Sequence, residues 1–215
     1  MNQTLRLTLA AVCAGLSCSA HAALVSVTSY DTFNGDSGTF HYWDKNYTGI
    51  GSKTTDHALL TGGTGDLTDG VIPLANWFNV ENSAGTGPYV GFLFFDPTII
   101  FHFAAPTSFS SATFFFDVAR AGAVNQPRSI DVNSLSFTLP IYPGTAPQSF
   151  TANLSSLAPT NTLAVTFHRS DAWVFISEAQ FAGTVVAAAV PEPSSHALML
   201  AGLAGLTVLA KRRKG

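Results

Sequence analysis

Three aromatic rings and several amide and guanidinium groups fall in segments with loop-like composition. A sugar presents apolar C–H faces and hydroxyl groups, so a carbohydrate-binding protein needs flat rings beside a few hydrogen-bonding side chains. The candidates come from the segments 40–47, 75–79 and 119–129: Tyr42, Trp43, Asn76, Trp77, Arg120, Asn125 and Arg128. These residues predict a ligand-binding surface made of loops. Large aromatics also plug the ends of β-structures, so a packing role for Trp43 and Trp77 stays open.

The segment "GDLTDG" could supply hard oxygen ligands to Ca²⁺ through Asp66 and Asp69. Two carboxylates alone are few for such a site, and their spacing is not that of an EF-hand. The alternative is a turn at Asp69-Gly70, in which the aspartate side chain caps its own backbone. We favour the turn, and we expect no cofactor.

Catalytic patterns are scarce. The chain has no G-x-S-x-G motif, and its histidines do not have the spacing of a zinc site. His102 lies between Phe101 and Phe103, which predicts a strand histidine rather than a metal ligand. Carboxylate pairs could hydrolyse glycosides, but the twelve acids of the chain body produce many accidental pairs. We therefore expect a protein that is not an enzyme.

The charge distribution argues against nucleic acid as a partner. The chain has 215 residues, and only 11% of them are charged. Residues 23–190 hold five cations and twelve acids, a net charge of −7. Phosphate binding requires a basic face, which this composition does not provide.

The elements that must position the candidate residues have a period of two, which is typical of β-strands. In "SATFFFDV", Ala112, Phe114, Phe116 and Val118 fall on one face and Asp117 on the other. The segments 134–141, with Ile141 on the apolar face, and 161–170 alternate in the same way. Segments 89–95 and 98–103 are apolar on both faces, which predicts central strands. With a first strand near 24–30 and a last one at 172–183, we predict a jelly-roll β-sandwich of eight to ten strands.

The first 22 residues have the pattern of a secretory signal peptide. Arg6 precedes an apolar stretch, and Ala20-His21-Ala22 forms an A-x-A cleavage pattern. Cys13 and Cys18, the two cysteines of the chain, both lie inside this segment. Cleavage after Ala22 would leave a mature protein without disulfides, whose fold must rest on its hydrophobic core.

The C-terminal segment has the pattern of a short membrane anchor. Residues 197–210 carry no charge, and as a helix they would reach about 21 Å, short of a hydrocarbon core of about 30 Å. Residues 194–196 can extend this helix into the interface, which predicts a transmembrane helix at about 195–210. The cations that follow should stay in the cytoplasm, so the body of the protein would face outward. These cations are Lys211, Arg212, Arg213 and Lys214.

This ending resembles the PEP-CTERM sorting signal of Gram-negative bacteria. The matching features are a box, a short apolar helix and a basic end; the box residues are Val190, Pro191, Glu192 and Pro193. The resemblance implies export with the help of signal peptidase, transient anchoring in the inner membrane, and processing by an exosortase. The protein would then join the cell surface or the extracellular matrix.

Two further segments, "GDLTDGVI" at 65–72 and "WVFISEAQFAG" at 173–183, resemble the galactose-binding-like or discoidin-type sandwich. That fold hosts carbohydrate, lipid and protein binders as well as structural modules, so it does not fix a function. The predicted organisation is a signal peptide at 1–22, a sandwich domain at 23–186 and a sorting tail at 187–215. Two hypotheses remain: binding of exopolysaccharide, or a structural surface or matrix protein without a specific ligand.

Overall fold

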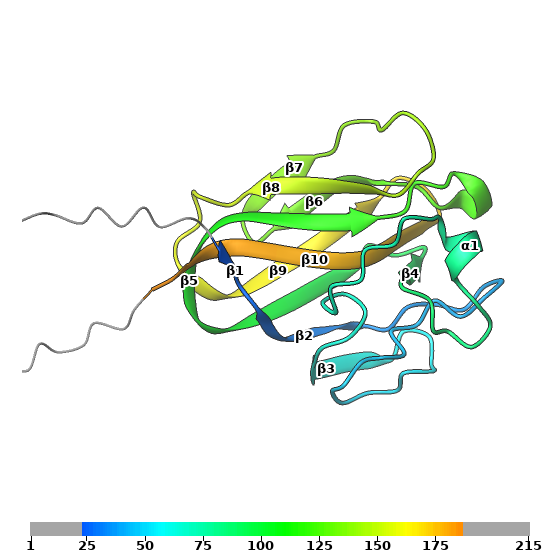
Figure 1. The fold of residues 1–215 in the computed structure, drawn as a ribbon, viewed down its shortest axis with the longest axis horizontal. Coiled ribbons are helices and arrows are strands. Elements are labelled where there is room, and N and C mark those ends of the chain that lie inside the picture. The colour runs from blue at the N-terminus through cyan, green and yellow to red at the C-terminus, as the bar shows by residue number, and fades with distance from the viewer. Residues whose placement is uncertain (1–22, 187–215) are drawn as a thin grey trace, which may run out of the picture.

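The computed structural model describes residues 23–186, which form an all-β domain (Figure 1). Its strands are β1 (Ala23–Leu24), β2 (Val27–Phe33), β3 (Leu59–Gly63), β4 (Val90–Leu93), β5 (Thr98–Phe116), β6 (Pro127–Val132), β7 (Leu135–Thr138), β8 (Gln148–Asn153), β9 (Thr160–Arg169) and β10 (Trp173–Val185). Two short helices, α1 (Trp77–Val80) and η1 (Ala121–Ala123), interrupt the loops. The predicted signal peptide, processing box and membrane anchor lie outside the described residues. Within residues 23–186, no helix has the length and apolar character needed to cross a membrane.

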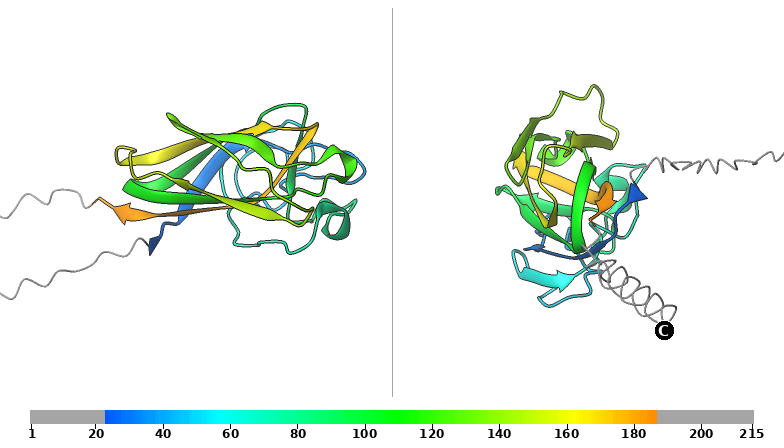
Figure 2. Two further views of the ribbon diagram at one scale, coloured as in Figure 1. Left: turned by 90° about the horizontal axis from the view of Figure 1, so that it is seen from above. Right: turned by 90° about the vertical axis from the view of Figure 1, so that its left-hand side faces the viewer.

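The long strand β5 belongs to two layers. Its first part, Thr98–His102, lies between β2 and β9, and its second part, Thr107–Phe116, pairs with β10. Strand β8 pairs with the second part over Ser111–Phe116, whereas β6 and β7 extend the layer of β9. A strand that changes layers in this way forms a corner between two sheets, and Figure 2 shows the layers from two further sides.

Alternating apolar residues of the two layers meet in the core. Phe101 contacts Phe181 with ring centroids 4.9 Å apart, and Phe114 contacts Phe167 at 5.3 Å. Phe116 is fully buried as well, so the predicted apolar face of "SATFFFDV" is confirmed. Each such side chain contributes roughly 1.5–3 kcal/mol through burial. Since residues 23–186 contain no cysteine, packing of this kind must hold the domain together.

Three details of the strand prediction are wrong. The segment 89–95 is not a central strand, because β4 pairs only with β10 and its other edge is bonded to the loop after β2. Ile141 is 86% exposed, because β7 ends at Thr138 and the alternation ends with it. Asp117 follows the last residue of β5 and is buried.

A second apolar cluster closes one end of the domain. Its buried members are Tyr42, Tyr89, Val124 and Phe175, and Phe40, Trp77, Val80 and Trp173 pack against them. Gly91 of β4 must be glycine here, since an added Cβ would lie 2.5 Å from the Phe175 ring. The first and last residues of the domain lie at the opposite end from this cluster. Strand β1 pairs with the last residues of β10, whereas Trp173 begins that strand (Figure 1).

Candidate functional site

Two of the three predicted ligand-binding rings are packing residues. Tyr42 is only 2% exposed, and its ring contacts Phe175 at 4.6 Å and Trp173 at 5.2 Å. Trp77 is half-buried against the same cluster, 5.8 Å from Tyr42. The prediction that Tyr42 lies on a ligand-binding surface is therefore wrong. Trp173 packs against the same cluster.

Asn76 is committed to the structure of its own loop. Its Nδ2 donates to Asp117 Oδ1 at 2.7 Å and to the Thr145 carbonyl, which uses both amide hydrogens. The second oxygen of Asp117 accepts the Trp77 backbone N–H at 2.6 Å. Burial raises the pKa of Asp117, and these hydrogen bonds partly offset the cost of its buried charge. Asn76 thus fixes α1 to the end of β5.

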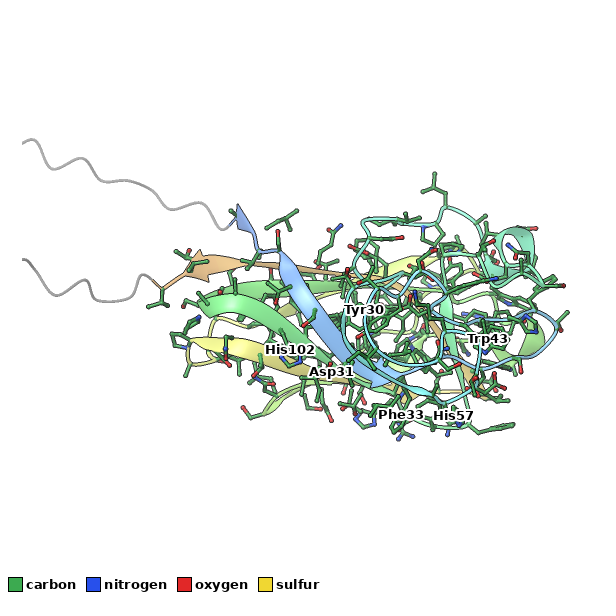
Figure 3. The ribbon with its side chains drawn as sticks, turned by 90° about the horizontal axis from the view of Figure 1, so that it is seen from below. Tyr30, Asp31, Phe33, Trp43, His57 and His102 are labelled. Carbon is green, nitrogen blue, oxygen red and sulfur yellow. The ribbon has the colours of Figure 1, made fainter. Side chains whose placement is uncertain are left out.

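Trp43 lies apart from the aromatic cluster, on the face shown in Figure 3. Its ring stacks on His41 with centroids 4.0 Å apart, and its Nε1 donates to Asp56 Oδ1 at 2.6 Å. The neighbouring His57 contacts Asp36 at 2.7 Å. Trp43 is half-buried.

The remaining three candidates come together. Arg120, Asn125 and Arg128 line one groove of about 660 Å³ at the same end of the domain as the aromatic cluster. Gln126 and Ser170 form part of its polar lining, and Leu139 and Ile141 give it an apolar wall. The sequence indicated the first three because they share one loop. Gln126 belongs to the same loop but was not singled out, and Thr138, Leu139, Ile141 and Ser170 come from segments farther along the chain.

The loop that carries Arg120 has an unusual backbone. Arg120 and Ala123 adopt left-handed φ angles of 59° and 58°, which non-glycine residues rarely occupy. The loop is closed by the Arg120 N–H, which donates to the Val124 carbonyl at 2.8 Å. Across the groove, the Arg120 guanidinium donates to the Tyr142 carbonyl at 2.8 Å. Backbone strain of this kind persists where surrounding contacts enforce it, and it is enriched at functional sites.

Gln126 fixes the opposite wall of the groove. Its side chain is buried, with Nε2 donating to the Pro140 carbonyl at 2.6 Å and Oε1 accepting the Tyr142 N–H at 2.9 Å. Ser170 Oγ donates to the backbone carbonyl of Gln126. These bonds hold the segment after β7 beside the start of β6, so the groove exists without a ligand. Preformed sites of this kind bind with a smaller loss of conformational entropy.

The groove also concentrates positive charge. Among the lysines and arginines of residues 23–186, only Arg169 forms an ion pair, with Asp96 at 3.2 Å. Arg120 and Arg128 are both exposed, and no carboxylate of the described residues lies within ion-pair distance of either. Two of the five cations in the acidic body of the chain therefore face the same groove.

The predicted calcium ligands have other partners. Asp69 Oδ1 accepts the Val71 N–H at 2.8 Å, and Gly70 has a φ of 82°, which is the turn that we favoured. Asp66 is 2% exposed and accepts a hydrogen bond from Asn46 at 2.7 Å. Burial, with the nearby charge of Asp44, raises the pKa of Asp66 to about 7. The described part of the chain contains no cluster of three or more His, Cys, Asp or Glu side chains that could hold a metal ion.

Several carboxylates are buried away from the groove. Glu81 is 7% exposed, and its Oε1 accepts the Tyr89 N–H at 2.9 Å, whereas Oε2 has no partner among the described residues. Burial raises the pKa of Glu81 to about 8. Burial likewise raises the pKa of Glu178 to about 7, although its Oε2 accepts the Gly70 N–H at 3.1 Å. Because their pKa values differ between the folded and unfolded states, these groups make the stability of the fold depend on pH.

The histidines pair with carboxylates on the strands. His102 Nε2 lies 2.8 Å from Asp31 Oδ2 across β5 and β2, as Figure 3 shows, which agrees with a strand histidine. His168 is held on both sides, by Asp96 at 3.0 Å and Asp131 at 2.7 Å. The hydrogen bonds to these carboxylates raise the pKa of His168.

Comparison with known proteins identifies the tail. Residues 189–214 match the model of the PEP-CTERM protein-sorting motif. The chain is therefore an exported protein whose tail anchors it transiently in a membrane and marks it for processing by an exosortase. The motif covers 26 residues and does not describe the β-domain. No curated protein matches the chain significantly.

Proposed function

We propose that this exosortase-sorted protein reaches the cell surface or the extracellular matrix and binds exopolysaccharide through its β-domain. We also propose that the domain is a jelly-roll sandwich of the galactose-binding-like type, and that it acts by binding rather than by catalysis. The observation that carries the binding proposal is the preformed groove where Arg120, Asn125 and Arg128 meet.

The two kinds of wall in this groove support the choice of ligand. The guanidinium and amide groups can hydrogen-bond to sugar oxygens, and the exposed Ile141 offers an apolar surface to the C–H face of a sugar ring. The position of the groove also fits. Val186 leads into the sorting tail, and it lies at the end of β10 opposite the groove. A domain held through its tail would present the groove outward.

A structural role without a specific ligand remains the second candidate. It is favoured by the burial of Tyr42 and the packing of Trp77 and Trp173, which use the rings at this end of the domain for folding. The two functions differ in one measurable way: only the first requires affinity of the isolated protein for a polysaccharide.

Retention of the exported, purified protein on immobilised exopolysaccharide from a producing bacterium would test the proposal. We expect the wild type to be retained and the double variant Asn125→Ala, Arg128→Ala to lose retention while keeping its unfolding midpoint. Lys53→Ala removes one cation outside the groove and should bind like the wild type. A wild type that binds no polysaccharide would favour the structural role.

A further inference from the structure

Most of the side chains that line the groove can donate hydrogen bonds, and the two arginines can only donate. Asn125 Oδ1 accepts the Gln126 N–H at 2.9 Å, and Gln126 Oε1 accepts the Tyr142 N–H, so each amide oxygen already accepts one hydrogen bond. Asn125, Arg120 and Arg128 are part of the groove lining, and each carries N–H donors on its side chain. A sugar hydroxyl can accept from these donors, but it brings no negative charge to the two guanidinium groups. A carboxylate only accepts, and it matches this donor set.

The two arginines have the chemistry for such a group. A guanidinium presents paired N–H donors in a planar fork that fits the two oxygens of a carboxylate. Arg120 uses one terminal nitrogen for the Tyr142 carbonyl, which orients the rest of its fork and leaves donors free. The backbone carbonyl of Arg128 accepts the Leu139 N–H at 3.0 Å, which fixes the base of the second side chain against β7.

The charge of the whole domain makes the groove selective. Twelve acids in residues 23–190 give the body a net charge of −7, so a polyanion is repelled over most of the surface. Within residues 23–186, neither guanidinium group of the groove forms an ion pair, and no acidic residue is part of the groove lining. An anionic chain would therefore be directed to this one place, with Ile141, which is 86% exposed, against a ring face.

We infer that the groove binds an acidic polysaccharide, with Arg120 and Arg128 contacting the carboxylates of its uronic acid residues. This inference rests on the proposed function and narrows it from exopolysaccharide in general to chains that carry carboxylates. Two guanidinium groups in one groove can contact neighbouring acidic residues of the same chain, so affinity should depend on the density of carboxylates along the polymer.

The experiment compares polygalacturonate with its fully methyl-esterified form, which keeps the sugar and removes the charge. Binding of the exported, purified protein to each polymer is measured at low and high salt. We expect at least about tenfold tighter binding to the free acid, weakened by salt. Arg128→Gln should weaken the affinity for the free acid about tenfold or more. Arg128→Lys should restore only part of this affinity, because an ammonium group lacks the planar fork of a guanidinium.

Arg120→Asn tests the second guanidinium with a residue that tolerates the left-handed backbone, and it should also weaken binding to the free acid. Lys53→Gln is the matched control, since it removes one positive charge outside the groove. It should leave the preference for the free acid over its methyl ester unchanged. Unfolding midpoints confirm that each variant is folded.

Each outcome has a distinct meaning. Equal affinity for the acid and its ester would overturn the inference and leave polysaccharide binding intact. Dextran sulfate bound more tightly than polygalacturonate would also overturn it, because the groove would then select charge density rather than carboxylate geometry. If neither these polymers nor immobilised native exopolysaccharide is bound, the proposed function itself fails.

Discussion

Glu81 should make the domain less stable as the pH rises. Its pKa is about 8 in the folded state against an ordinary value of 4.5, because burial disfavours the carboxylate. Between these values the folded state holds a proton that the unfolded state has lost. The free energy of unfolding therefore falls with increasing pH across this window, and the stabilisation from the neutral acid is complete only below it.

The magnitude follows from the pKa difference. Each unit corresponds to about 1.4 kcal/mol, so the interval from pH 5 to pH 8 could remove up to about 4 kcal/mol through this one group. Local rearrangement and entry of water reduce such a cost, and we expect about 2–4 kcal/mol. Glu81→Gln keeps an oxygen that can accept the Tyr89 N–H and removes the titration. The free energy of unfolding of Glu81→Gln should therefore fall less with increasing pH than that of the wild type, by the amount that Glu81 contributes.

Urea unfolding followed by tryptophan fluorescence at pH 5, 6, 7 and 8 measures the effect. The difference in unfolding free energy between the wild type and Glu81→Gln should grow steadily up to about pH 8. Glu178→Gln serves as a comparison: the pKa of Glu178 is about 7, so its difference from the wild type should stop growing near that pH. Parallel pH profiles for the wild type and Glu81→Gln would refute the reasoning.

Four further predictions concern the core, the cysteines, the tail and Trp43. Phe116→Ala should lower the free energy of unfolding by about 3–5 kcal/mol in urea titrations, and a loss below about 1 kcal/mol would contradict the packing of β5. The exported protein should unfold at the same midpoint with and without reductant, since residues 23–215 contain no cysteine; a shift would show that a signal-segment cysteine is retained. Glu192→Ala with Pro193→Ala should trap an uncut, larger species in the inner membrane of a host with an exosortase, and unchanged mass and fractionation would leave only a plain anchor. Acrylamide should quench Trp43 more strongly than the two tryptophans of the aromatic cluster, as Trp43→Phe would reveal by removing the quenched component.

The strand pattern could be predicted because its signal is local. Phe114 and Phe116 lie two residues apart on one face of β5, and no distant contact is needed to place them. The change of layer within β5 could not be predicted from the sequence, because β5 continues through Pro106 as one strand without a break. Ile141 was misplaced because alternation continues in the sequence beyond the end of β7.

The site was predictable only where its residues share a loop. Arg120, Asn125 and Arg128 lie within nine residues, so their meeting required one loop to fold back. The burial of Tyr42 depends on Gly91 and Phe175, which are 49 and 133 residues away in the chain. The role of Gln126 likewise appears only when the Pro140–Tyr142 segment is in place. Such contacts are set by tertiary structure and leave no local pattern.

The pairing of β10 has a mechanical consequence for a protein attached through its tail. A pull on Val186 acts along the axis of β10, which is bonded to β5 from Ile176 to Val185 and to β1 and β4 beside it. Force in this direction loads the rungs of the ladder together, in shear, instead of opening them one after another. Resistance to such a load is set by the rate of forced unfolding rather than by equilibrium stability. Strand β10 is thus placed to carry tension between an anchored tail and a ligand gripped at the far end of the domain.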